Sequence, residues 1–155
     1  YENNKDVLNT IIIGGNSGSG KTTLAKMFVQ NNDFCLTIDS LREAIRQYFL
    51  LIDSMFDEFT IMYQETKSLP KEAMQYVLSK ELEMVAVFQE ILSSCVKAGV
   101  LNMNERELFL AANHLVVQGQ SWAFRKWALK NHFTIEEYIQ LQTNLFLNGV
   151  LHFEK

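Results

Sequence analysis

Apolar residues recur at helical spacing along most of the chain after residue 40. The longest such stretch is 71–98, where one stripe holds Met74, Val77, Leu78, Leu82, Val85, Phe88, Ile91, Leu92 and Cys95. Apolar positions three and four residues apart form one face of an α-helix. Similar patterns predict further helices over residues 41–54, 55–66, 105–131 and 135–151.

Breakers and start signals support these boundaries. Pro70 is the chain's only proline, and after residue 40 the glycines are Gly99, Gly119 and Gly149 alone. Ser40 with Glu43, and Thr134 with Glu137, have the spacing of capping boxes, and Asn104 with Glu107 is a close variant. Gly99 follows the long stripe and is expected to cap its C-terminus. The sequence therefore predicts long helices with few interruptions.

The last two predicted helices carry apolar residues on all sides. A helix that is apolar all round must be covered all round, and in a small chain a second subunit is the natural cover. We predict a homodimer that pairs these helices from each subunit in a four-helix interface. The expected interface residues are Ala111, His114, Leu115, Gln118, Leu145 and Leu147.

A different pattern occupies the first forty residues. The β-branched run 11–13 predicts a buried strand, a glycine-rich loop follows, and apolar spacing after Lys21 predicts a helix. The loop matches the phosphate-binding motif G-x-x-x-x-G-K-[ST], whose backbone N–H groups hold phosphate at a helix N-terminus. The expected phosphate-binding residues are Gly15, Asn16, Ser17, Gly18, Ser19, Gly20, Lys21, Thr22 and Thr23. Thr22 would also contact Mg²⁺ if nucleotide binds. A flexible Gly/Ser linker is the alternative.

Composition narrows the class of protein. The 155 residues suffice for one domain with an appended piece, which we divide into 1–40 and 41–155. A net charge of −4 offers no broad basic surface for nucleic acid. The chain has two cysteines, no run of 18 apolar residues and no recognisable signal peptide, so we expect a cytoplasmic protein without a membrane segment. Cys95 is expected to be a core thiol, and no metal site beyond nucleotide-bound Mg²⁺ is expected.

Six segments share a familiar order and spacing: residues 41–49, 62–74, 96–101, 122–129, 133–139 and 147–150. Through these segments the chain, from about Leu41 to Leu151, resembles the C-terminal effector-binding and dimerisation domain of TetR-family transcriptional regulators. It implies a helical domain with a small-molecule cavity among its first helices and dimerisation through its last two. Candidate pocket residues are Met55, Met62, Tyr63, Phe88, Gln89 and Trp122, with His114 as a further candidate. Such regulators bind DNA through a helix-turn-helix, which this sequence does not show.

Residues 9–46 separately resemble the start of P-loop small-molecule kinases. That resemblance implies ATP and Mg²⁺ as cofactors, with Lys21 and Asp39 in catalysis. Asp39 fits better as an acidic residue at a helix start, and Asp53 fits better within a helix than as a metal-binding carboxylate. We therefore predict a mainly α, TetR-type effector domain with a short N-terminal strand–P-loop–helix segment. Its expected function is ligand-responsive transcriptional regulation, and the alternative is a P-loop kinase or ATPase.

Overall fold

The described part of the chain, residues 37–151 of a computed structural model, folds into helices and contains no strand. In chain order the elements are α3 (Ile38–Ser54), α4 (Phe56–Glu65), the 3-10 turn η1 (Thr66–Ser68), α5 (Lys71–Lys97), α6 (Glu105–Phe124), α7 (Lys126–Leu129) and α8 (Ile135–Leu151). The prediction of a mainly α fold is confirmed. The predicted strand–P-loop–helix segment lies outside the described residues.

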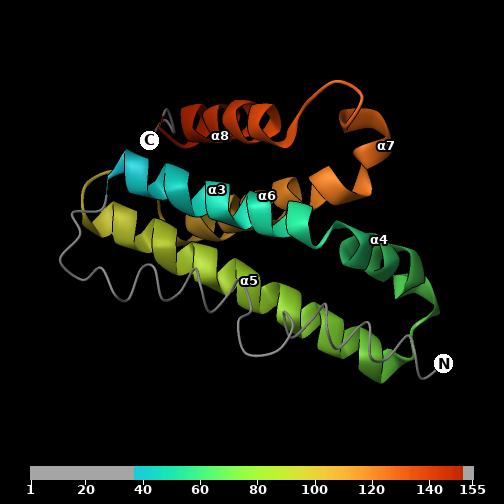
Figure 1. Cartoon of the computed structure of the whole chain (residues 1–155). Helices are drawn as coiled ribbons and strands as arrows, with labels where there is room; N and C mark the ends of the chain where they lie inside the picture. Colours follow the sequence, from blue (N-terminus) through green and yellow to red (C-terminus); the bar gives the residue numbers. More distant parts are fainter. Residues whose placement is uncertain (1–36, 152–155) are drawn as a thin grey trace.

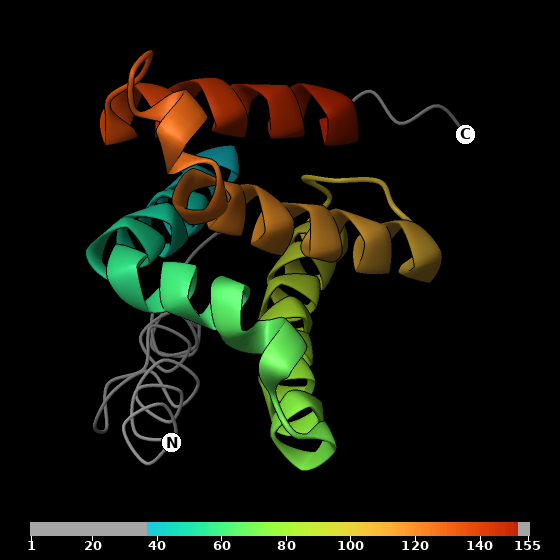
Figure 2. The ribbon, with the colours of Figure 1, turned by 90° about the vertical axis from the view of Figure 1, so that its right-hand side faces the viewer.

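Helix α6 lies at the centre of the fold. It contacts α3, α4, α5, α7 and α8. Figure 1 shows the long α5 crossing below α3, with α8 on the opposite side of α3. Figure 2 shows α6 between α8 and the α4–α5 pair. This central position explains why residues 105–124 are apolar on so many sides, because neighbouring helices of the same chain cover much of the surface of α6.

The first helix begins earlier than the sequence predicts. Thr37, not Ser40, is the N-cap, and the Thr37 Oγ1 accepts a hydrogen bond from the Ser40 backbone N–H at 3.2 Å. Ser40 Oγ in turn accepts from the Thr37 N–H at 2.9 Å. The apolar run over residues 34–38 is also short enough for a strand, but its last two residues are not extended: Thr37 caps a helix that starts at Ile38. Residues 34–36 lie outside the described range.

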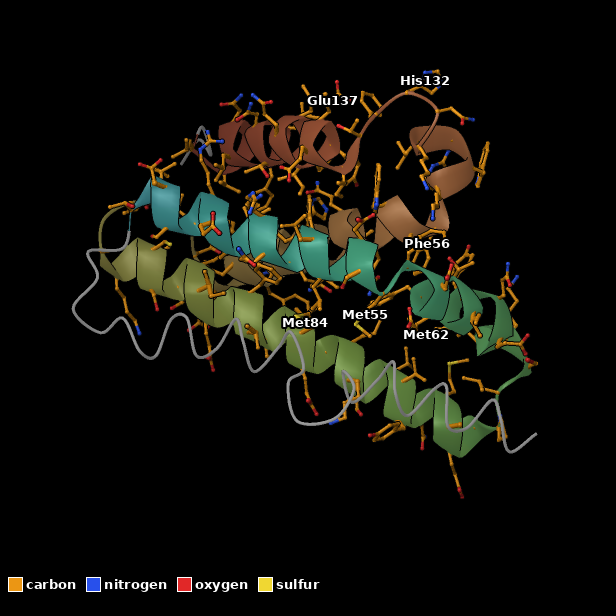
Figure 3. The ribbon with its side chains drawn as sticks, viewed as in Figure 1. Met55, Phe56, Met62, Met84, His132 and Glu137 are labelled. Carbon is orange, nitrogen blue, oxygen red and sulfur yellow. The ribbon has the colours of Figure 1, made fainter. Side chains whose placement is uncertain are left out.

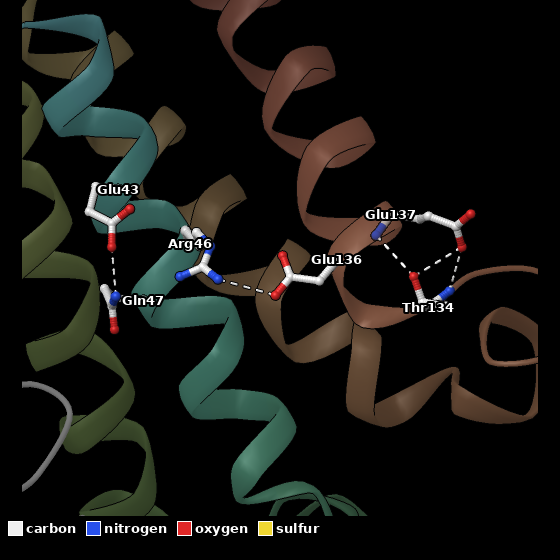
Figure 4. Close-up of polar contacts among 6 residues, drawn as sticks. All are labelled: Glu43, Arg46, Gln47, Thr134, Glu136 and Glu137. Carbon is white, nitrogen blue, oxygen red and sulfur yellow. Dashed lines mark hydrogen bonds and ion pairs between the residues drawn. The ribbon is translucent and has the colours of Figure 1, made fainter.

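The predicted starts of α6 and α8 and the predicted end of α5 agree with the structure. Asn104 and Glu107 form a reciprocal capping box on α6. Thr134 and Glu137 do the same before α8, where the Thr134 N–H donates to Glu137 Oε2 at 2.8 Å (Figure 4). These hydrogen bonds lower the pKa of Glu137. Gly99 follows α5 with a φ of +76°, the left-handed conformation that glycine adopts without a Cβ clash. The predicted C-cap glycine is confirmed.

The predicted helix 105–131 is interrupted at Arg125. The Arg125 backbone leaves the helical region with φ −111° and ψ 22°, and α6 ends at Phe124. The chain then turns into the short α7, and Lys126 places its Nζ 3.0 Å from the ring centre of Phe56 on α4. Neither glycine nor proline marks this break, so the sequence pattern alone did not reveal it.

The core lies where α3, α5, α6 and α8 meet. Its largest fully buried side chains include Tyr48, Phe49 and Phe88. Tyr48 meets Phe88 edge-on with ring centres 5.0 Å apart, and the Tyr48 hydroxyl donates to the Val116 carbonyl at 2.9 Å. Cys95 is fully buried, as predicted, and burial raises the pKa of its thiol to about 11. These contacts join three helices around one centre.

Candidate functional site

A cavity of about 80 Å³ lies between α3, α4, α5 and α6. Its walls are mostly apolar and are formed by Leu51, Ile52, Phe59, Met62, Val77 and Met84. Its polar side chains are Tyr48, Lys80, Glu81 and Gln120. Figure 3 shows Met62 on α4 and Met84 on α5, the two helices that form the lower walls. An apolar pocket with a few convergent polar groups is the usual form of a small-molecule site.

Hydrogen bonds hold the polar side chains of the cavity in place. Gln120 Nε2 donates to Glu81 Oε1 at 2.8 Å, and only 8% of Gln120 is exposed. Burial, and then the negative charge of Glu81, hold the pKa of Tyr48 well above its ordinary value. Tyr48 therefore stays a neutral hydroxyl group at physiological pH. Lys80 forms an ion pair with Glu83 at 3.1 Å.

The α4 wall contributes little to the main core. Its one buried residue, Met62, forms a small apolar cluster with Val77, Phe59 and Leu69, while the half-buried Phe56 and Phe59 also pack against the main core. A helix with a single buried side chain costs less to displace than one in the central core. This matters because about 80 Å³ is well below the ~300–1,000 Å³ of a typical ligand pocket. A drug-sized ligand would require the wall to move outward.

The predicted pocket residues lie in several places. Of the six, only Met62 lines this cavity. Phe88 is fully buried in the core, and Trp122 is 2% exposed. Met55 lies at the junction of α3 and α4, while Tyr63 and Gln89 line other surface hollows. Whether any of them contacts a ligand stays a prediction.

Two residues considered for other roles have structural positions. Asp53 lies inside α3, and its Oδ1 accepts a hydrogen bond from Trp122 Nε1 at 2.7 Å. Asp39 lies in the first turn of α3, where its negative charge favours the positive end of the helix dipole. Both positions agree with the helical interpretation of these residues.

Sequence reasoning did not select Tyr48, Glu81 or Gln120. Gln120 carried a signal, because it shares a helical face with the apolar Val116 and Ala123. A polar residue on a buried face needs a partner, and here Glu81 is that partner. Tyr48 carried no comparable signal, since a tyrosine within an apolar stripe is ordinary core.

A second surface of interest runs along α6 and α8. Ala111, Leu115 and Leu147, three predicted interface residues, are buried within the chain itself. His114 is exposed, Gln118 is half-buried, and Leu145 is 68% exposed. His114, Gln118 and Leu145 border a groove of about 200 Å³. Leu110, Val117 and Leu141 expose further apolar area on these helices.

The predicted phosphate loop, residues 15–23, lies outside the described residues. Within residues 37–151 no group of three His, Cys, Asp or Glu side chains is arranged to hold a metal ion. None of the helices in that range is long and apolar enough to cross a membrane.

The described part of the chain is thus an all-α domain with a partly open apolar cavity between its helices and an exposed apolar face on its last helices. The family model for the tetracyclin repressor-like C-terminal domain matches residues 37–125. The chain therefore belongs to this family, and the TetR resemblance is confirmed. No solved structure gives a significant match.

The chain is also similar to a curated protein, the HTH-type transcriptional regulator HbdR of Aromatoleum sp. (strain CIB). The two are 23% identical over 104 residues, which cover 66% of this chain. The matched region spans 44% of the length of HbdR.

Proposed function

We propose that this chain is the effector-binding and dimerisation part of a ligand-responsive transcriptional regulator of the TetR type. The observation that carries the proposal is the apolar cavity between α3, α4, α5 and α6 in a member of this family. The similarity to an HTH-type regulator supports it. A helix-turn-helix belonging to the same regulator would contact DNA, and this domain would bind the small molecule.

The cavity suits an effector with an apolar body and at least one polar group. The two methionines, Met62 and Met84, are flexible and can repack around different apolar shapes. Glu81 and Gln120 offer an acceptor and an amide to the polar group. Since only one residue of α4, Met62, is buried, effector binding would displace α4 and shift the population of domain conformations.

Dimerisation would use the exposed apolar face of α6 and α8. Leu110, Val117, Leu141 and Leu145 are each at least half exposed, so the isolated chain leaves much of this face in contact with water. Gln118 Oε1 is buried but has no hydrogen-bond partner among the described residues. A second copy would cover the exposed apolar area. Pairing by a two-fold axis would set the distance between two DNA-reading segments.

The test is a cavity-filling substitution in the complete regulator. The DNA is a labelled duplex from upstream of the regulator's own gene, and binding is measured by fluorescence anisotropy. Candidate effectors are small molecules that raise the melting temperature of the regulator. Each is then tested for its ability to release the regulator from the DNA. Val77 is 4% exposed and lines the cavity, so Val77→Phe should preserve DNA binding while raising the effector concentration needed for release about tenfold or more.

The matched control is Leu78→Phe. Leu78 is the next residue on α5, is 51% exposed and does not line the cavity. The Leu78→Phe variant should release DNA at the same effector concentration as the wild type. Unchanged release by Val77→Phe would place the effector elsewhere, and failure of the wild type to bind any such DNA would contradict a regulatory function.

A further inference from the structure

A third hollow, of about 530 Å³, lies between α4, the end of α6 and α7. It is separate from the apolar cavity and from the α6–α8 face, because the three share no lining residue. Four aromatic residues line it: Phe56 and Tyr63 from α4, Phe124 from α6 and Trp127 from α7. Lys126 and Lys130 line the same hollow. We call this set the aromatic–lysine groove.

The aromatic rings already form a stacking surface. Tyr63 lies nearly parallel to Phe124, with ring centres 4.4 Å apart and an angle of 25° between the planes. Yet Tyr63 is 61% exposed and Trp127 is 73% exposed, the largest exposed fraction among the large apolar residues described. Exposed aromatic area gathered in a hollow, rather than scattered singly, is typical of a binding site. Flat rings of this kind hold a flat ligand by offset stacking.

The charge in the groove is positive and only partly compensated. Neither lysine forms an ion pair with a carboxylate among the described residues. Instead Lys126 lies over the ring of Phe56, which Figure 3 labels below α7. The guanidinium of Arg125 lies 5.4 Å from the ring centre of Trp127. The pKa of Lys126 is lowered by desolvation and then by the positive charge of Lys130, while Asp57 and Asp53 act in the opposite direction. An anion between the two lysines would relieve their mutual repulsion.

We propose that the aromatic–lysine groove binds a planar aromatic anion, stacked against Tyr63 and Trp127 with its charge beside Lys126 and Lys130. This site goes beyond the proposed function, which assigns the effector to the apolar cavity. Both an aromatic carboxylate and a purine nucleotide present the required chemistry, a flat ring with a negative group at its edge. The side-chain amides of Gln64 and Asn131 also line the groove and can donate hydrogen bonds to acceptor atoms of the ligand.

The two tryptophans provide the test. Trp127 lines the groove, whereas Trp122 is buried and hydrogen-bonded to Asp53. In the ¹⁵N-labelled full chain, two indole N–H signals are followed by NMR, and Trp127→Phe assigns them. The probes, titrated separately, are 2-naphthoate and adenosine monophosphate. At least one should shift the Trp127 signal in a saturable manner and leave the Trp122 signal in place; which one does so identifies the ligand class.

Charge and flatness are tested separately. The double variant Lys126→Gln with Lys130→Gln should raise the dissociation constant of the bound probe about tenfold or more, because two charge-assisted contacts are lost. The control double variant Lys71→Gln with Lys97→Gln removes the same charge from exposed positions on α5 and should bind normally. Cyclohexanecarboxylate, an anion without a flat ring, should bind much more weakly than 2-naphthoate.

Three results would overturn the proposal: neither aromatic probe shifts Trp127, the two double variants weaken binding equally, or cyclohexanecarboxylate binds as tightly as the aromatic probes. The variant Val77→Phe separates this site from the proposed effector cavity: it changes no residue that lines the groove, so the probe should still shift the Trp127 signal in a saturable manner. If no probe binds the groove while the cavity still binds effector, only the groove proposal fails. If the groove binds a probe while the cavity binds no effector, only the proposed effector site fails.

Discussion

At the scale of single residues, the close approach of Tyr48 to Gly119 fixes how α3 packs against α6. A Cβ placed on Gly119 would lie 2.3 Å from Tyr48 Cε1, far inside van der Waals contact. The Tyr48 ring cannot easily withdraw, because it is 1% exposed, meets Phe88 and bonds to the Val116 carbonyl. Gly119 is therefore required for lack of a side chain, not for unusual backbone angles.

We expect Gly119→Ala to lower the free energy of unfolding by about 1–3 kcal/mol through overpacking. Urea unfolding at one fixed protein concentration measures this loss. Gly149→Ala is the matched control, since a Cβ on Gly149 within α8 meets nothing within 4 Å. That variant should be neutral or more stable by up to about 1 kcal/mol, because alanine favours helix more than glycine. Equal stability of the two variants would contradict the packing described here.

At the scale of helices, capping signals decide where the elements begin. Asn104 Oδ1 accepts from the N–H groups of Arg106 and Glu107, both at 3.0 Å, and Glu107 Oε2 accepts from the Asn104 N–H at 2.7 Å. Three otherwise unsatisfied N–H groups at the start of α6 are thereby paired. Because α6 contacts every other α-helix described, fraying at its start would loosen the domain as a whole.

Asn104→Ala should cost about 1 kcal/mol of folding free energy, the usual loss for a removed N-cap. Asn102→Ala, an exposed change two residues earlier and outside the helix, should stay within about 0.5 kcal/mol of the wild type. Urea unfolding monitored by far-ultraviolet circular dichroism compares them. A loss of the same size for both variants would mean that the capping box contributes nothing specific.

The sequence allowed the helices to be placed because caps and the 3.6-residue period are local. The bounds of α8 match the prediction at both ends, and α5 ends where Gly99 indicated. The break at Arg125 was missed because a tertiary contact, Lys126 over Phe56, accompanies it rather than a breaker residue. The cavity was located only in part for the same reason: Tyr48, Glu81 and Gln120 come together from three helices, and no local pattern encodes that meeting.

At the scale of the whole molecule, the proposed association of two chains would use the α6–α8 face. Leu145 is 68% exposed and borders the groove on this face, so a charge there does not disturb the core of the single chain. Leu145→Asp should convert a dimer into a monomer, because the charge would have to be buried at the interface without a partner. Sedimentation velocity at several concentrations measures the association directly.

The control for this prediction is Leu78→Asp, which introduces the same charge at a 51% exposed leucine on α5. It should sediment as the wild type does. A monomeric wild type, or an unchanged dimer of Leu145→Asp, would show that this face is not the interface.

Helix α4 has one further consequence for the whole molecule. Phe59 and Met62 on one side of it line the apolar cavity, while Phe56, Thr60 and Tyr63 on the other side line the aromatic–lysine groove. A single ten-residue helix is thus the partition between two compartments. A ligand that displaces α4 from one side would change the space available to a ligand on the other side. Thermodynamic linkage would make the effect of each ligand on the affinity for the other equal. With a ligand in each of the two proposed sites, two chemically different molecules would be sensed jointly through this one helix.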